Sequence, residues 1–421
     1  MQLKSPLNAA ALALLGLSQA SAAADAAPGW SFDTSTLVYS EADGRVQAAE
    51  PRVRATRTWD SGRSASLGLT LDTLTGASPN GATPSSAPQT FTTPSGNGSY
   101  TIAAGETPLD DTFRDTRIAL DASFSTPLGT RNTLTTTLFA STEYDYLSIG
   151  AGATIARDFN LRNTTVSLGV NVSQDSIDPV GGVPQPLSRM PGENEPIGRT
   201  EGTESKQVFD VLASVTQLLS PTSLVTLTAS LSLSDGYLTD PYKILSVVGT
   251  DGEPLRYVYE GRPDSRFKQA VYGEYKRFIA DRDAWTISLR LMSDDWGVFS
   301  QTVDSTYRWN FGARDYLEPH LRYYRQSEAD FYRAALFDGE ENGLVEASAD
   351  PRLAAFDAIT IGLKYGHTTR GGLPWWVRLE GYTQLGRTAG VPAAAADGLS
   401  KFDLEPELNA VMFTAGFRFD R

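Results

Sequence analysis

Polar and apolar residues alternate strictly along most of this chain, with little helical periodicity to compete with the alternation. In the last such segment, Val411, Phe413 and Phe417 fall on one face, while Thr414 and Arg418 fall on the other. Successive side chains of a β-strand point to opposite faces, so a period of two predicts strands that have one apolar and one polar face. The sequence therefore predicts an all-β protein.

The same alternation predicts sixteen strands, which is an even number. They are expected near residues 30–40, 44–58, 63–72, 113–126, 132–145, 149–158, 163–173, 206–218, 223–234, 266–279, 284–293, 299–311, 315–325, 355–367, 373–385 and 408–419. Fourteen strands are the alternative, because little sequence separates the fifth predicted strand from the sixth.

The connections between these strands are of two kinds. Short connections, such as residues 60–62 and 220–222, follow even-numbered strands. The long connections all follow odd-numbered strands and lie near residues 73–111, 174–205, 235–265, 326–354 and 386–407. Short periplasmic turns and long external loops are typical of outer-membrane barrels, whereas a soluble β-sandwich has no reason to keep this order. The pattern predicts a transmembrane, up-and-down, antiparallel β-barrel with both termini in the periplasm.

The first residues have the composition of a secretory signal peptide. Lys4 is followed by an apolar stretch from Leu7 to Leu17 and by Ala20-x-Ala22, a site of the signal-peptidase type. The apolar stretch is shorter than the roughly 20 residues that a membrane-spanning helix needs. Residues 1–22 are therefore expected to be cleaved, and residues 23–421 to form a barrel in the outer membrane of a Gram-negative cell.

Composition excludes several classes of function. The 421 residues include no cysteine, which excludes disulfides, thiolate metal sites and a cysteine nucleophile. The formal net charge of −14 argues against a nucleic-acid partner. The excess acid lies in the long loops, where charge runs are expected to be solvated.

Basic residues are predicted on the inward faces of the second half of the barrel. The lumen candidates are Arg290, Arg308, His320, Arg322, Lys364, Arg378, Arg418, Glu274, Glu318 and Glu380, together with Lys268, Lys276 and Asp304. Such side chains can line a water-filled lumen that favours anions or polar solutes. Alternatively, they pair across strands and fill a closed lumen.

Two features of the sequence resemble parts of a catalytic or metal site but do not complete one. Alternation places His320 on the inward face and His367 on the outward face, so the two histidines cannot share a site, and no nucleophile lies at a defined spacing from either. Asp338-x-Glu340-x-Asn342-Gly343 resembles half of a calcium loop, but Ala349 stands where the final acidic ligand is expected. No enzyme activity, metal or cofactor is expected, and a barrel hydrolase is the third hypothesis.

Two segments carry a specific resemblance to a family. They are Asp72–Ala82, which reads DTLTGASPNGA, and Gly236–Lys243, which reads GYLTDPYK. With the length and the terminal Phe417-Arg418-Phe419, they resemble an uncharacterised family of Gram-negative outer-membrane barrel proteins. The resemblance implies a barrel in the outer membrane, suggests a redox- or metal-linked envelope system, and implies no established activity.

The segments supply loop candidates. Asp72, Thr73 and Thr75 are expected at the external mouth, and Asp240 and Tyr242 open the third long loop. The first segment either forms a constriction, binds a ligand, or is a turn in which Asp72 and Thr75 cap backbone amides.

These patterns favour an outer-membrane channel or transport component for small polar or anionic solutes. The alternative is a closed barrel that serves as a binding or scaffold component of an envelope system. The expected partners are outer-membrane lipids and lipopolysaccharide, the barrel assembly machinery and a periplasmic protein.

Overall fold

The computed structural model describes residues 28–93, 98–111, 114–192, 199–279 and 282–421. The predicted signal peptide, residues 1–22, lies outside the described residues. None of the described helices is long and apolar enough to cross a membrane.

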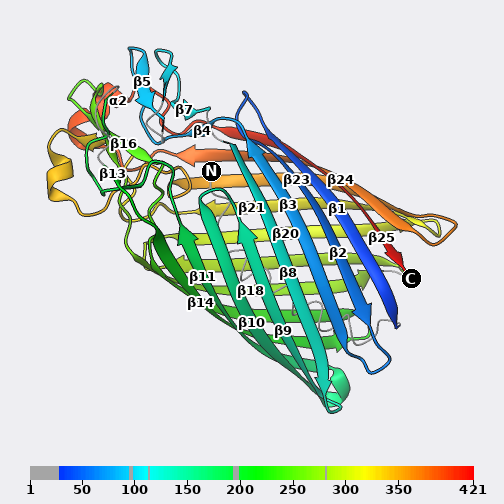
Figure 1. The fold of residues 1–421 in the computed structure, drawn as a ribbon. Coiled ribbons are helices and arrows are strands. Elements are labelled where there is room, and N and C mark those ends of the chain that lie inside the picture. Colours follow the sequence, from blue (N-terminus) through cyan, green and yellow to red (C-terminus); the bar gives the residue numbers. More distant parts are fainter. Residues whose placement is uncertain (1–27, 94–97, 112–113, 193–198, 280–281) are drawn as a thin grey trace.

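Sixteen antiparallel strands close into a barrel, which confirms the predicted fold class (Figure 1). The first eight are β1 (Gly29–Glu41), β2 (Gln47–Thr58), β3 (Ser64–Thr75), β8 (Arg114–Leu128), β9 (Asn132–Thr142), β10 (Tyr146–Phe159), β11 (Thr164–Ile177) and β14 (Glu204–Ser220). The other eight are β15 (Ser223–Gly236), β18 (Ser265–Ile279), β19 (Asp283–Asp294), β20 (Phe299–Phe311), β21 (Asp315–Gln326), β23 (Ala355–Thr368), β24 (Pro374–Arg387) and β25 (Leu408–Asp420).

The strand register excludes the alternative of fourteen strands. β9 and β10 are separate strands that pair from Leu147 opposite Thr142 to Arg157 opposite Asn132. The barrel closes where β1 pairs with β25, from Ser31 opposite Asp420 to Glu41 opposite Ala410.

The wall of the barrel is apolar outside and polar inside. On β3, Leu67 is 58% exposed and Leu69 is 39% exposed, whereas the alternate residues Ser64 and Ser66 are buried. Val170 and Val172 repeat this outward pattern on β11. A continuous band of exposed apolar side chains around a closed barrel matches the lipid-facing surface of membrane barrels.

The five long connections all lie at one end of the barrel, as their place after odd-numbered strands predicts, and they share that end with the short connections at residues 42–46, 143–145 and 295–298. The connections after even-numbered strands are all short and lie at the other end, which we call the short-turn end. The short-turn end contains η1 (Asn160–Arg162), a single 3₁₀ turn between β10 and β11. The long connections span residues 76–113, 178–203, 237–264, 327–354 and 388–407. They gather at the other end of the barrel (Figure 1), and we call these five connections the cap.

The cap contains its own secondary structure. Its elements are β4 (Ser78–Pro79), β5 (Gln89–Thr92), β6 (Ser99–Ile102), β7 (Leu109–Asp110), β12 (Val183–Pro184), β13 (Arg199–Thr200), β16 (Ile244–Val248), β17 (Pro254–Tyr259), β22 (Leu336–Phe337), η2 (Glu340–Gly343), η3 (Ala393–Ala395) and α2 (Ala396–Leu399). Strand β16 pairs with β17 from its own loop and, in parallel, with β22 from the loop at 327–354. Separate loops are thus joined into one small sheet.

Buried apolar clusters also tie the loops together. One contains Leu245, Val247 and Leu336, and another brings Phe91 against Ile244 and Tyr259. Because these side chains come from three different loops, the cap folds as a unit with a hydrophobic core.

Candidate functional site

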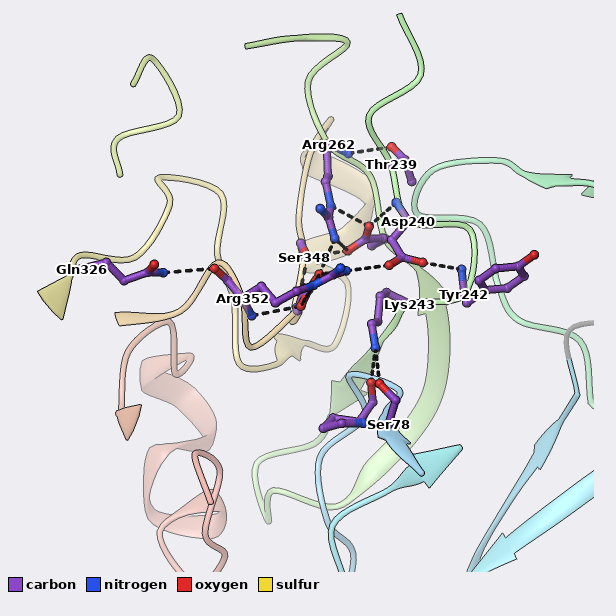
Figure 2. A network of polar contacts seen from close by, with 12 residues as sticks. Ser78, Thr239, Asp240, Tyr242, Lys243, Arg262, Gln326, Ser348 and Arg352 are labelled. Atoms are coloured by element: carbon purple, nitrogen blue, oxygen red, sulfur yellow. Dashed lines mark hydrogen bonds and ion pairs between the residues drawn. The ribbon is translucent and has the colours of Figure 1, made fainter. Parts of the chain in front are cut away.

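A cluster of six charged residues lies inside the cap, with four of them buried and its two arginines half-buried (Figure 2). It consists of the acids Asp240, Glu260 and Asp350 and the bases Lys243, Arg262 and Arg352. The expectation that the acidic residues of these loops are solvated is therefore wrong for these three acids. Equal numbers of acids and bases make the burial tolerable, because each charge has an opposite charge in reach.

The arginines connect acids from different loops. Arg262 lies 2.6 Å from both Glu260 and Asp350, measured from its Nε and Nη2 atoms respectively. The Nη2 atom of Arg352 lies 2.6 Å from the Oδ2 atom of Asp240, and its guanidinium also pairs with Asp350. The side chain of Gln326, at the end of β21, donates to the carbonyl oxygen of Arg352 at 3.0 Å and so links the cluster to the wall.

Burial and opposite charges act against each other on the pKa values of these acids. Burial would raise the pKa of Asp240, but Arg352, Lys243 and Arg262 lower it to about 2. Burial would also raise the pKa of Asp350, but Arg352 and Arg262 hold that pKa well below its usual value. At Glu260 burial prevails and the pKa is raised.

The two segments that carry the family resemblance contact each other in the cap. The buried ammonium of Lys243 donates to the carbonyl oxygen of Pro79 and lies 3.4 Å from the Oγ atom of Ser78. The amide of Ile244 donates to the carbonyl oxygen of Asn80 at 2.9 Å. A Cβ atom at Gly81 would lie 2.2 Å from the carbonyl oxygen of Ile244, so only glycine permits this approach. These contacts show that the segments hold two loops together.

The loop candidates are placed as follows. Asp72 is buried on β3 and accepts a hydrogen bond from Arg117 at 3.3 Å. Thr73 and Thr75 lie on the exposed face of β3, so they do not form a constriction. Asp240 belongs to the buried charged cluster. The hydroxyl of Tyr242 donates to Asp145 at 2.6 Å, which joins the third long loop to the connection between β9 and β10.

Beneath the cap, inside the barrel, lies a cavity of about 670 Å³. Arg262 and Arg352 line it from the cap, and Arg290, Arg322 and His320 line it from the wall. In all, its lining includes six Lys or Arg residues and two carboxylates, those of Asp210 and Glu380. The lining of the cavity is therefore strongly basic, and it contains five of the predicted lumen residues: Lys268, Arg290, His320, Arg322 and Glu380.

His320 is held between two carboxylates. Its Nε2 atom lies 2.9 Å from the Oδ2 atom of Asp304 on β20, and its Nδ1 atom lies 2.6 Å from the Oε1 atom of Glu380 on β24. Glu380 reaches His320 across β23, where Gly362 lies opposite both residues. A Cβ atom at Gly362 would lie 2.7 Å from Glu380, so this glycine leaves room for the contact. Both ring nitrogens are occupied by carboxylates rather than by a nucleophile.

The other lumen candidates pair with one another, as the closed-lumen alternative describes. Glu318 is shared by Arg308 at 2.8 Å, Arg378 at 3.5 Å and Lys364 at 4.0 Å. Elsewhere in the lumen, Glu274 pairs with Lys276 at 3.0 Å. At the end of β25, Arg418 pairs with Asp420 at 3.1 Å.

The residues that sequence reasoning missed lie in the cap and at the top of the cavity. Arg262, Asp350 and Arg352 come from loops that show no strand alternation, and Tyr324 and Phe356 were not among the candidates. Asp350-Pro351-Arg352 gave no recognisable signal, because the role of its charges depends on residues from another loop. The run Ile244–Val248, apolar except for Ser246, is the signal by which a buried segment inside this loop could have been found.

The described residues include no group of three or more histidine, aspartate or glutamate side chains that could hold a metal ion. In the half-motif at 338–343, Glu341 pairs with Arg256, and the carboxylate of Glu340 accepts the amide of Phe337 at 2.9 Å. These carboxylates therefore stabilise η2 and its surroundings.

A closed sixteen-strand barrel with an apolar outer band and a polar lumen places this protein in the class of outer-membrane-type β-barrels. The chain belongs to the family described as "Protein of unknown function (DUF3570)", whose model matches residues 4–419. No curated protein matches the sequence significantly.

Several solved structures match this chain at low similarity. The ferric enterobactin receptor of Pseudomonas aeruginosa is 10% identical, with a TM-score of 0.42 over 85% of this chain and 54% of that chain. A bacterial polysaccharide outer-membrane secretin is 9% identical, with a TM-score of 0.45 over 94% of this chain and 100% of that one. CdiB from Acinetobacter baumannii is 8% identical, with a TM-score of 0.47 over 94% of this chain and 61% of that one. The chain spans about half the length of the siderophore receptors that it matches.

Proposed function

We propose that this protein is an outer-membrane transport component for small polar or anionic solutes. The band of exposed apolar side chains around the barrel supports a location in a lipid bilayer. The observation that carries the proposal is the basic cavity inside the barrel wall. Guanidinium and ammonium groups around a wetted lumen attract anions and repel cations.

The cap stands between this cavity and the outside in the proposed mechanism. Arg262 and Arg352 belong both to the buried charged cluster and to the cavity lining. Loosening the cluster would therefore open the cavity at the loop end. Transport then requires movement of the cap, which gates the lumen.

Conductance in planar lipid bilayers tests the proposal. We expect purified, folded protein to give pores that prefer anions, seen as a shift of the reversal potential in a salt gradient. The double variant Asp350→Ala, Arg352→Ala is expected to conduct more than the unmodified protein, because it loosens the cap. Lys401→Ala, which removes a partly exposed ion pair with Glu253 on the cap, is the matched control. Folded protein that gives no pores, with or without the cap substitutions, contradicts a channel.

The packed core of the cap favours a second candidate, a closed barrel that acts as a binding or scaffold component. Three loops bury apolar side chains against each other there, which suits a rigid binding surface. Co-purification of a specific periplasmic or cell-surface protein, in the absence of conductance, would favour this function.

A further inference from the structure

Two arginines in the cavity differ from the other three arginines that line it. Arg262, Arg266 and Arg352 each pair with at least one carboxylate. In the part of the chain that the structure describes, Arg290 and Arg322 form no ion pair. Lys268 on β18 likewise forms no ion pair among the described residues and adds an ammonium group to the lining. Arg290 and Arg322 carry the two guanidinium groups whose charge is available to a ligand.

The nearby carboxylates are committed to other partners. Asp304 lies opposite Arg322 in the strand register but bonds His320. Glu380 also bonds His320, and Asp210 accepts a hydrogen bond from Asn171 at 3.2 Å. Two guanidinium groups that face one cavity repel each other, and an anion placed between them removes that repulsion.

The strand register brings the two arginines to one side of the cavity. Arg290 on β19 lies opposite Thr302 on β20, and Thr302 lies opposite Tyr324 on β21. Arg322 precedes Tyr324 by two residues and shares its face. Arg290, Tyr324 and Arg322 thus line neighbouring positions of one wall.

Apolar side chains occupy the same part of the lumen. Met292 follows Arg290 by two residues on the same face of β19, and Phe356 packs against Tyr324 with ring centroids 5.5 Å apart. Leu212 and Met412 contribute from other strands. Inward positions of a membrane barrel are usually polar, so an apolar wall beside two arginines indicates a ligand with an apolar part.

We propose that the cavity binds a small organic anion, with its carboxylate or phosphate group between Arg290 and Arg322 and its apolar body against Met292 and Phe356. A volume of about 670 Å³ suits a small organic molecule rather than a bare inorganic ion. Arginine is suited to both head groups because its planar fork donates two parallel hydrogen bonds. The inference deepens the proposed transport function by naming the class of substrate.

Isothermal titration calorimetry tests the site, with the full protein in nanodiscs of zwitterionic lipid. Benzoate and phenyl phosphate are probes that combine an anionic group with an apolar ring. Inorganic phosphate is a probe with the anionic group alone, and benzyl alcohol is an uncharged probe with the ring. Benzoate and phenyl phosphate are expected to bind at one site per barrel. Inorganic phosphate is expected to bind about tenfold more weakly, and benzyl alcohol more weakly still.

Substitutions locate the binding. Arg290→Gln and Arg322→Gln are each expected to weaken the binding of phenyl phosphate about tenfold or more, because each substitution removes a charge-assisted hydrogen bond. Phe356→Ala is expected to weaken phenyl phosphate but not inorganic phosphate. Lys276→Gln, which changes a basic lumen residue outside the cavity, is the control and is expected to leave binding unchanged. Migration of the unheated barrel in gels establishes that each variant is folded.

Two results overturn the site: none of the probes binds, or the folded double variant Arg290→Gln, Arg322→Gln binds phenyl phosphate as tightly as the unmodified protein. Conductance of the same preparations separates this inference from the proposed function. Binding without pores supports the site and contradicts a channel. Anion-preferring pores without binding support transport and overturn the site.

Discussion

The wall of the barrel and the cap bury their side chains in opposite senses. Along the wall, apolar residues such as Leu67 and Val170 point outward, whereas charged residues such as Asp210 and Glu318 point into the lumen. In the cap, Leu245 and Val247 are fully buried in a core, as in a soluble domain. One chain thus follows two rules, because lipid surrounds the wall in the proposed location while water surrounds the cap.

The ionic groups of the two regions differ in the same way. The arginines Arg352 and Arg308 are similarly exposed, at 35% and 41% of their side chains, but their acidic partners differ. Asp350 in the cap is 1% exposed, whereas Glu318 in the lumen is 11% exposed and is shared by three basic residues. Solvent weakens the interaction of exposed charges and compensates when one partner is lost. An equivalent substitution should therefore have a large effect in the cap and a small one in the wall.

The largest effect is expected for Arg352→Ala in the cap. The substitution removes the arginine that pairs with both Asp240 and Asp350 and leaves buried charge uncompensated, at a cost of about 3–5 kcal/mol to cap stability. Hydrogen exchange of residues 237–264 and 327–354 should accelerate while the barrel strands stay protected. Exchange in these loops that matches the unmodified protein would show that the cluster does not hold the cap.

A second effect is expected from Glu405, which lies between the cap and the wall. Burial raises its pKa to about 7, and the nearby Asp403 acts in the same direction, although the hydroxyl of Tyr332 donates to it. Arg45 lines the same small pocket. The folded pKa is above the unfolded one, so ionisation costs stability as the pH rises from about 4.5 to 7.

Glu405→Gln is therefore expected to slow exchange of residues 388–407 at pH 8, by about tenfold. At pH 4 the substitution should change little, because the carboxyl is protonated in both states. Equal effects at the two pH values would contradict the assigned titration.

An intermediate effect on the wall is expected for Gly362→Val. The new side chain would occupy the space through which Glu380 reaches His320, at a cost of about 1–3 kcal/mol from overpacking. The control is Gly381→Val, since a Cβ atom at Gly381 meets no atom within 4 Å. Urea unfolding of the barrel measures the stability of both variants. Equal midpoints would show that the contact between Glu380 and His320 across Gly362 contributes nothing to stability.

The smallest effect is expected for Arg308→Ala, the counterpart in the wall of the first substitution. Glu318 keeps Arg378 and Lys364 as partners, and the lost side chain is partly exposed, so the change should stay within about 1 kcal/mol. Urea unfolding again provides the measurement. A loss as large as that of Arg352→Ala would remove the distinction between the two regions.

The wall could be predicted from the sequence because the alternation within each strand shows which side chains face the lumen and which face outward. Period-two alternation placed all sixteen strands and put Arg290, Arg322 and His320 on the inward face before any contact was known. It could not say which charges pair. The reach of Glu380 across Gly362 depends on strands that are paired side by side.

The cap could not be predicted in the same way. Its short strands carry few alternating positions, and the pairing of β16 with β22 joins loops that are far apart in the chain. In the sequence, Asp240 and Asp350 resemble solvated loop acids. Only the fold shows that both pair with Arg352, which lies in a different loop from Asp240. Local patterns contain no record of such contacts, so the acidic loops were expected to be solvated.

The pairing of β1 with β25 has a consequence for how the protein forms. Trp30 and Arg421 exchange backbone hydrogen bonds at 2.7 Å, which joins two strands from opposite ends of the sequence. Until β25 arrives, β1 presents an open edge with unsatisfied backbone groups, and so does β24. The seam is also the contact of longest range in the wall, and such contacts form slowly. Closure is therefore a single late event in biogenesis. Any chain interrupted before β25 is left as an open sheet whose two edge strands have unpaired backbone groups and can pair with other chains.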